Sequence, residues 1–190
     1  MSPGTLRTFI AFPIGEDLVE KIAALQNELK KLKLDAKWVD PKKIHLTVKF
    51  LGDTPSDAIE KIRSSVEEAA KRHLPFSVTV DTFGAFPNFM SPRVLWIGGE
   101  SPAEAESFAE VLNETLHPLG FEKEQKKFKP HLTLARLKSL KNEKRLSKFV
   151  KDYALSWKET IPCETLIHYK STLTPNGALY EPLYQIPLSD

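Results

Sequence analysis

Apolar positions along the chain follow helical and strand periods in an order that occurs twice. In the first half, spacings of three and four define two helical faces, and shorter apolar runs between them are typical of strands. The predicted elements are, in order, strand 7–12, a helix with its apolar face over 18–32, strand 44–51, a helix with its apolar face over 59–70, and strand 76–80. This half is therefore predicted to form a β-α-β-α-β unit.

The second half repeats this order. Its predicted elements are strand 93–98, a helix with its apolar face over 105–116, strand 131–137, a helix with its apolar face over 146–153, strand 161–169 and, after the turn sequence Thr174-Pro175-Asn176-Gly177, a last strand over 178–188. No low-complexity linker separates the halves. We therefore expect one two-lobed α+β domain over residues 1–190, built from pseudo-repeats at approximately 1–90 and 91–190.

Capping residues predict where two of the helices begin. Thr54 precedes Pro55 and, at the third position, Asp57, so Thr54 is the predicted N-cap of one helix. Ser101 is followed by Pro102 and, three residues later, by Glu104, which is the pattern of a capping box.

A tetrapeptide recurs at the matching place in both halves. His45-Leu46-Thr47-Val48 in the first half returns as His131-Leu132-Thr133-Leu134 in the second. Because side chains alternate along a strand, the histidine and threonine of each copy share one face, opposite two core residues. One copy alone would fit a buried histidine satisfied by the backbone, but two copies in matching context favour a functional surface. We hypothesise that the two motif strands pair across a pseudo-twofold axis.

Two imidazoles and two hydroxyls suit the cleavage of a phosphodiester. One proton must leave the nucleophile and another must reach the leaving oxygen, and histidine, with an unperturbed pKa near 6.5, performs both transfers near neutral pH. Each well-placed transfer is worth about 10²–10⁴-fold in rate. The hydroxyls can donate hydrogen bonds to the nonbridging oxygens. A 2′,3′-cyclic phosphate fits a site without a metal because ring strain lowers its barrier.

Other chemistries fit the sequence less well. A catalytic zinc site typically has three protein ligands, yet no Asp or Glu accompanies either motif strand and no His-x-x-x-His or Cys pair occurs. Nucleophilic attack by Thr47 or Thr133 would not explain why both halves carry the same pair. A Gly-rich phosphate loop is absent, which argues against a nucleoside triphosphatase.

The composition of the chain bears on its partners and its location. With 27 basic and 25 acidic residues the net charge is +2, which neither demands nor excludes a nucleic-acid partner. Lysine clusters precede both motif strands, at 42–43 and 123–129, so we expect them to help steer a phosphate. Cys163 is the only cysteine, which favours a reducing, cytoplasmic location. No apolar stretch is long enough to span a membrane. The remaining histidines, His73, His117 and His168, are interpreted as capping or structural.

Several segments together resemble the two-histidine phosphoesterase superfamily, and within it the RNA 2′,3′-cyclic phosphodiesterases, also called 2′-5′ RNA ligases. The segments are Arg7-Thr8-Phe9-Ile10-Ala11-Phe12, His45 to Gly52, Gly84-Ala85-Phe86-Pro87, Pro92 to Trp96, Pro130 to Arg136, and Ser171 to Gly177. The resemblance covers nearly the whole chain. It implies an α+β fold with two antiparallel sheets flanking a central cleft and helices on the outer faces.

The resemblance also implies a reaction and roles. A terminal RNA 2′,3′-cyclic phosphate would be hydrolysed to a 2′-phosphomonoester without metal or cofactor, with His45 as proton donor and His131 as proton acceptor. Thr47 and Thr133 would bind the phosphate, and reverse 2′-5′ ligation is a secondary expectation. The near-symmetry of the halves does not itself assign the acid and the base. We expect a monomer whose partner is RNA with a 2′,3′-cyclic end or a 2′-5′ linkage.

Arg136 is a further candidate phosphate ligand. It lies five residues after His131, so a regular strand would direct it to the opposite face; it can reach the phosphate only if the strand ends or bulges first. Trp38, Phe86 and Trp96 are candidates for stacking on a terminal base, although aromatic residues are also routine core residues.

Two alternatives stay open at this point. The same chemistry could act on a small substrate, such as a cyclic nucleotide or an ADP-ribose cyclic phosphate. A module that binds RNA ends without turnover is a third interpretation, but binding alone does not need two proton-transferring groups.

Overall fold

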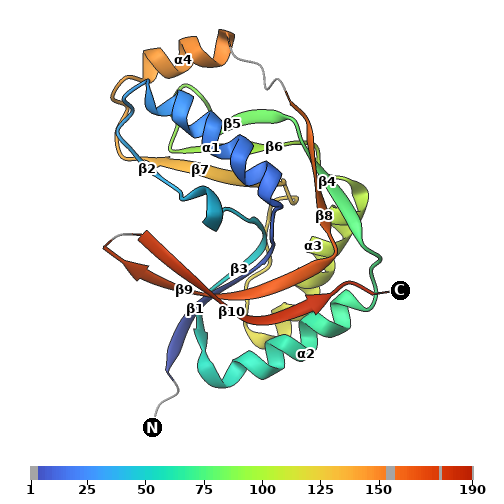
Figure 1. The fold of residues 1–190 in the computed structure, drawn as a ribbon. Helices are drawn as coiled ribbons and strands as arrows, with labels where there is room; N and C mark the ends of the chain where they lie inside the picture. Colours follow the sequence, from blue (N-terminus) through green and yellow to red (C-terminus); the bar gives the residue numbers. More distant parts are fainter. Residues whose placement is uncertain (1–3, 153–156, 176, 190) are drawn as a thin grey trace.

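The chain folds into antiparallel sheets and four helices in the computed structural model, which describes residues 4–152, 157–175 and 177–189 (Figure 1). The strands are β1 (Thr5–Phe12), β2 (Ala36–Trp38), β3 (Leu46–Pro55), β4 (Phe76–Val80), β5 (Thr82–Phe86), β6 (Val94–Gly98), β7 (His131–Leu137), β8 (Glu159–Cys163), β9 (Thr165–Thr174) and β10 (Gly177–Pro187). The helices are α1 (Glu16–Lys30), α2 (Ile59–Ala70), α3 (Ala103–Leu116) and α4 (Glu143–Asp152). The expected α+β class is confirmed.

Two four-stranded sheets carry the fold. Their strand orders are β10-β9-β1-β3 and β2-β7-β6-β5, and β4 pairs with β8 in a third, two-stranded sheet. All of these pairings are antiparallel. Each sheet takes strands from both halves of the chain, so the two halves are interlocked by exchange of strands.

The helices cover the sheets through the apolar faces that the sequence predicts. Helix α1 buries Leu18, Ile22, Leu25 and Leu29 and crosses the sheet that contains β7 (Figure 1). The buried Gln26 fixes this crossing, because its side-chain amide donates to the carbonyl oxygens of Val39 and Leu134. Since Leu134 lies inside the second motif strand, α1 from the first half supports the site strand of the second.

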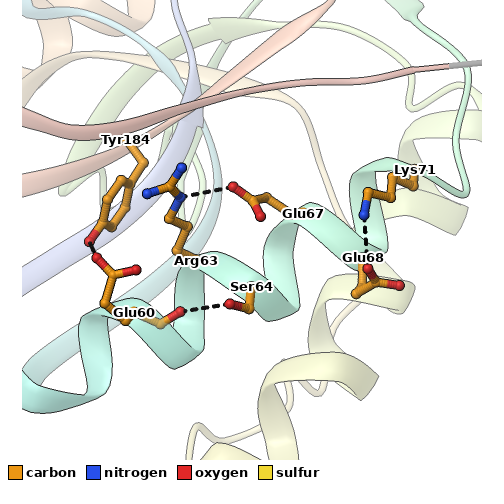
Figure 2. Close-up of polar contacts among 7 residues, drawn as sticks. All are labelled: Glu60, Arg63, Ser64, Glu67, Glu68, Lys71 and Tyr184. Atoms are coloured by element: carbon orange, nitrogen blue, oxygen red, sulfur yellow. Dashed lines mark hydrogen bonds and ion pairs between the residues drawn. The ribbon is translucent and has the colours of Figure 1, made fainter.

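Helix α2 is attached to β10 by a polar cluster on its exposed side (Figure 2). The hydroxyl of Tyr184 donates to Glu60 at 2.6 Å, and the guanidinium of Arg63 lies 4.8 Å from the centre of the same ring. Arg63 also donates to Glu67, one turn further along α2. These contacts bind the C-terminal strand to a helix of the first half.

Both predicted helix starts are wrong. Strand β3 continues to Pro55, and the Thr54 hydroxyl is buried against that of Thr8 at 2.8 Å, so it does not cap a helix; α2 begins only at Ile59. Gly52, with φ of +70°, lets β3 continue past the position where the strand was expected to end. At the start of α3 no side chain caps the helix, and the hydroxyl of Ser101 is buried without a hydrogen-bond partner among the described residues.

Two further predictions need correction. The single strand expected over 161–169 is two strands in different sheets, β8 and β9, separated at Glu164. The short strands β2 and β5 were not predicted. The end of the apolar face placed at Tyr153 and the Asn176 position of the predicted turn lie outside the described residues.

Candidate active site

The two motif histidines are oriented by the same backbone contact. Nδ1 of His45 lies 2.8 Å from the carbonyl oxygen of Lys43, and Nδ1 of His131 lies 2.8 Å from that of Lys129. Because a carbonyl only accepts, each Nδ1 carries the donated proton. Nε2 of each ring has no hydrogen-bond partner among the residues that the structure describes. In both halves it is therefore the nitrogen available to a substrate.

Aromatic side chains enclose the ring of His45. It stacks on Phe9 with ring centres 4.5 Å apart, and the edge contact with Tyr180 is 5.1 Å. Tyr169 lies further out at 5.9 Å. Phe9 is on β1, whereas the tyrosines come from β9 and β10, so the C-terminal hairpin forms one wall of the first histidine's environment.

His131 has a lighter aromatic contact. Its ring meets Phe86 edge-on at 5.1 Å, and Phe86 in turn stacks on Trp96 at 5.0 Å. The ammonium of Lys129 lies 4.8 Å from the centre of the Trp96 ring. Lys43, at the matching place in the first half, donates instead to the carbonyl of Ala178 on β10. The two lysines that precede the motifs thus hold the walls of the site.

A β-bulge brings Arg136 to the same face as His131 and Thr133. Against β6, Thr133 pairs with Trp96 and Ala135 with Leu95, which leaves Leu134 as the extra residue. Leu134 and Ala135 are consecutively buried, and Arg136 is exposed. A bulge of this kind reverses strand parity beyond it. The condition under which Arg136 can face the site is therefore met.

The first motif strand bulges at the equivalent position. Against β1, Thr47 pairs with Ala11 and Lys49 with Ile10, so Val48 is the extra residue. Phe50 consequently occupies the place of Arg136 in this half and is 47 % exposed. The hydroxyls of Thr47 and Thr133 are not hydrogen-bonded to other described residues and remain available to a ligand. The four motif residues and Arg136 are thus presented from two strands with the same local geometry.

The hypothesis that the motif strands pair is wrong. Strand β3 is the edge of one sheet and β7 lies inside the other, so they contact each other without forming a ladder. Their imidazoles are nevertheless within electrostatic reach. The pKa of His45 is lowered to about 4; burial is the main cause, the bond to Lys43 opposes the shift, and the charge of His131 contributes to it.

Burial also lowers the pKa of His131 below its ordinary value. The bond to Lys129 opposes this shift, and the positive charges of Arg136 and Lys129 add to it. Both histidines are thus predominantly neutral at neutral pH in the free protein. A negatively charged ligand would favour their protonated forms.

The three candidate stacking residues differ in what they expose. Trp96 is only 4 % exposed, and its ring lies directly over Gly84, so it has no free face for a base. Phe86 is half-buried and directed at His131. Trp38 lies under the ammonium of Lys30, on the side of α1. Trp96 is therefore a support for the site and not a stacking platform.

The three histidines outside the motifs, His73, His117 and His168, have different surroundings. His168 is buried on β9, and neither of its ring nitrogens has a hydrogen-bond partner in the described part of the chain. His73 and His117 bond to the carbonyls of Ala69 and Phe121.

Among the described residues, no group of three or more His, Cys, Asp or Glu side chains is placed to hold a metal ion. None of the helices in this part of the chain is long and apolar enough to cross a membrane.

Sequence reasoning missed Tyr169, Tyr180 and the role of Phe9 beside His45. The tyrosines lie more than a hundred residues after the first motif, and only the order of the strands brings them there. Phe9 was within reach of prediction, because it belongs to the apolar run of β1 that flanks the first motif strand.

Comparison with known proteins identifies the family of the chain. The LigT-like phosphoesterase model matches residues 13–96 and again 98–180. The RNA 2′,3′-cyclic phosphodiesterase of Methanocaldococcus jannaschii is 35 % identical over 93 % of this chain and 97 % of its own length. That of Thermotoga maritima is 33 % identical over 95 % and 94 %.

Solved structures agree on the fold. The Thermus thermophilus protein TT0787 superimposes with a TM-score of 0.78 at 26 % identity, over 96 % of this chain and 97 % of its own. Escherichia coli LigT in complex with 3′-AMP gives 0.76 at 21 % identity, over 98 % and 100 %. The chain is therefore a phosphodiesterase and belongs to the LigT-like phosphoesterase family, a family of two-histidine phosphoesterases.

Proposed function

We propose that this phosphodiesterase hydrolyses the 2′,3′-cyclic phosphate at the end of an RNA chain to a 2′-phosphomonoester. Water attacks the phosphorus, the bond from phosphorus to the 3′-oxygen breaks, and the 2′-ester remains. The observation that carries the proposal is the pair of imidazoles within electrostatic reach of each other, each with Nδ1 bonded to the backbone and Nε2 free.

Each site residue has a role in this reaction. His131 accepts the proton of the attacking water, and His45 donates a proton to the departing 3′-oxygen. The hydroxyls of Thr47 and Thr133 donate to the nonbridging oxygens, where negative charge grows in the transition state. Arg136, on the same face, supplies a positive charge to the same oxygens.

The RNA substrate is supported by the names of the relatives, which are RNA 2′,3′-cyclic phosphodiesterases at up to 35 % identity. We propose that no metal takes part, since two imidazoles, two hydroxyls and a guanidinium supply both proton transfers and the charge on the phosphate. The reverse reaction, which joins RNA ends through a 2′-5′ linkage, uses the same groups in reverse order.

His45 has to take up its proton from solvent when the substrate binds. The free ring is neutral at neutral pH because burial lowers its pKa to about 4. The negative phosphate raises the pKa of an imidazole close to it. Binding therefore creates the acid that the reaction needs. Because two imidazoliums would repel each other, the favoured state has one ring protonated and the other neutral.

The test is turnover of a short RNA that ends in a 2′,3′-cyclic phosphate, with EDTA present and the product identified by mass and by phosphatase sensitivity. We expect the 2′-phosphate. His45→Ala and His131→Ala should each lose at least about 10²-fold in kcat while remaining folded. His117→Ala, at an exposed histidine, is the matched control and should retain activity.

Three outcomes would contradict parts of the proposal. A 3′-phosphate product would overturn the assignment of the leaving oxygen. Loss of activity in EDTA that is restored by a divalent cation would overturn metal-independence. Tight binding of the RNA without turnover would favour the binding module.

A further inference from the structure

Arg7 lies on the face of the sheet that holds His45. It is two residues before Phe9 on β1, so both side chains are on one face. The ring of Phe9 stacks on His45. Arg7 is thus next to Phe9 on the same face of the sheet. It lies toward the exposed start of β1, whereas Thr8 to Phe12 are buried.

Phe50 supports the guanidinium of Arg7. The guanidinium carbon lies 4.9 Å from the centre of the Phe50 ring, which the bulge in β3 brings to the site face. Asp53 is the register partner of Arg7 on β3, yet no ion pair joins Arg7 to a carboxylate in the described part of the chain. Arg7 is therefore a positioned, exposed cation with no carboxylate partner among the described residues.

Tyr180 connects this cation to the reaction site. Its ring has an edge contact of 5.1 Å with His45 and another of 5.1 Å with Phe9. Burial raises the pKa of the Tyr180 phenol, and the positive charges of Arg136 and Arg7 oppose that rise. The two guanidiniums thus both act on the ring that borders the catalytic imidazole, one from each half of the molecule.

Phe50, the ring beneath the Arg7 guanidinium, also lines a pocket that follows β3. It has a volume of about 520 Å³ and is lined by Phe50, Leu51, Asp53, Pro55 and the loop from Leu119 to Glu124. Its lining carries three carboxylates, Asp53, Glu122 and Glu124, and one ammonium, Lys123, which is paired with Glu114. The excess of negative charge disfavours a phosphate there, and the carboxylates offer acceptors to the amino groups of a base. The anion is best held at Arg7, between this pocket and the histidines.

We propose that Arg7 binds the phosphodiester that links the terminal nucleotide to the one before it, and that the preceding nucleoside extends over Phe50 toward this pocket. The proposal rests on the proposed function, since it assigns the cyclic phosphate to the two histidines. It makes the enzyme selective for oligonucleotide ends over nucleoside cyclic phosphates, which carry no second phosphate.

The chemistry of the guanidinium fits this role. Its planar set of donors matches the two nonbridging oxygens of a phosphodiester, and the stacked Phe50 ring reduces the conformational freedom that binding would remove. Phosphates follow each other once per nucleotide, so a second cation near the first anion site is useful only to a substrate that carries a second phosphate, as an oligonucleotide end does.

The experiment compares kcat/KM for a dinucleotide ending in a 2′,3′-cyclic phosphate with that for the nucleoside 2′,3′-cyclic phosphate. Wild type should prefer the dinucleotide by about tenfold or more, and Arg7→Gln should reduce this preference by about tenfold. Arg7→Lys keeps the charge and should retain part of the preference. Arg72→Gln, at an exposed arginine just beyond α2, is the matched control and should keep the wild-type ratio.

Salt dependence gives a second measurement. The slope of log KM against log salt for the dinucleotide should fall by about 0.7 in Arg7→Gln, which is the contribution of one phosphate contact in a single strand. An equal loss on both substrates would place Arg7 at the cyclic phosphate and overturn the proposal. An unchanged ratio in a folded Arg7→Gln would also overturn it. If wild type turned over neither substrate, the proposed function itself would fail.

Discussion

His45 and His131 are held by the same bond in the two halves of the chain, each with Nδ1 at 2.8 Å from the main-chain oxygen of the lysine two residues earlier. The distance is equal although the surroundings differ, since one ring is stacked among aromatic residues and the other meets a single phenylalanine. The backbone just before each motif, not the packing of the side chains, therefore sets which ring nitrogen is left free of the main chain.

This relationship predicts the tautomer of both rings. At neutral pH we expect His45 and His131 in the Nδ1–H form, because the carbonyl accepts only from a protonated Nδ1. Long-range ¹H–¹⁵N correlation spectra of the labelled protein report the tautomer directly, with His45→Ala and His131→Ala to assign the signals. Detection of the Nε2–H form for either ring would contradict the geometry and the availability of Nε2.

The lowered pKa values predict the pH dependence of catalysis. The profile of kcat/KM reports the free enzyme, and both histidines there have a pKa below the ordinary 6.5. Its optimum, which lies between the two apparent pKa values, should therefore fall below pH 6.5. The profile of kcat reports the complex, where the phosphate raises both values, so its optimum should lie at higher pH.

Kinetics across a pH series at several substrate concentrations would separate the two profiles. Coincident optima would mean that the bound phosphate does not stabilise the imidazolium, and the account of how His45 acquires its proton would then be wrong.

Arg136 is predicted to bind the reacting phosphate. Arg136→Gln should lower kcat/KM by about 10- to 100-fold, the range expected for loss of a charge-assisted hydrogen bond, and should weaken competitive inhibition by inorganic phosphate. Arg136→Lys should recover part of the loss. Arg145→Gln on α4, an exposed arginine, is the control. Unchanged phosphate inhibition in Arg136→Gln would remove Arg136 from the site.

The burial of His168 leads us to expect that the free energy of unfolding falls in acid. The ring is 1 % exposed, and burial lowers its pKa to about 4. The unfolded chain, with an ordinary pKa of 6.5, binds a proton more readily, so the contribution of His168 to stability is present above pH 6.5 and is lost as the pH falls toward 4. Between about pH 7.5 and pH 5 this amounts to about 2 kcal/mol.

Urea unfolding of wild type and His168→Leu at both pH values measures this contribution. The variant should be less sensitive to the change in pH by that amount, whereas His117→Leu, at an exposed histidine, should behave as wild type. Equal sensitivity in wild type and His168→Leu would show that the buried ring does not resist protonation.

Much of the site could be predicted from the sequence because it depends on local geometry. The alternation of side chains places His45 with Thr47 and His131 with Thr133, whatever the strands pair with. The helical faces of α1, α2 and α3 were likewise evident, because a 3.6-residue period needs no information from elsewhere in the chain.

The remainder depended on contacts distant in sequence. The bulge at Leu134 that turns Arg136 toward the site is visible only when β7 is aligned with β6. Thr54 has the sequence of a helix cap, yet its buried bond to Thr8 extends β3 and displaces the start of α2. The break at Glu164 is equally hidden, because a polar residue between apolar ones is also what a single alternating strand contains.

The exchange of strands between the two halves of the chain ties the first histidine to the last part of the sequence. His45 is encoded near the start, but Tyr169 and Tyr180, which pack around it, lie on β9 and β10. A chain that stopped after β8 would still contain both histidines, both threonines and Arg136, and would leave Phe9 and the outer edge of β1 uncovered. Premature termination late in translation would thus remove the aromatic packing around His45, the first site residue in the sequence. The surroundings of the first motif would be complete only when the final hairpin had been synthesised.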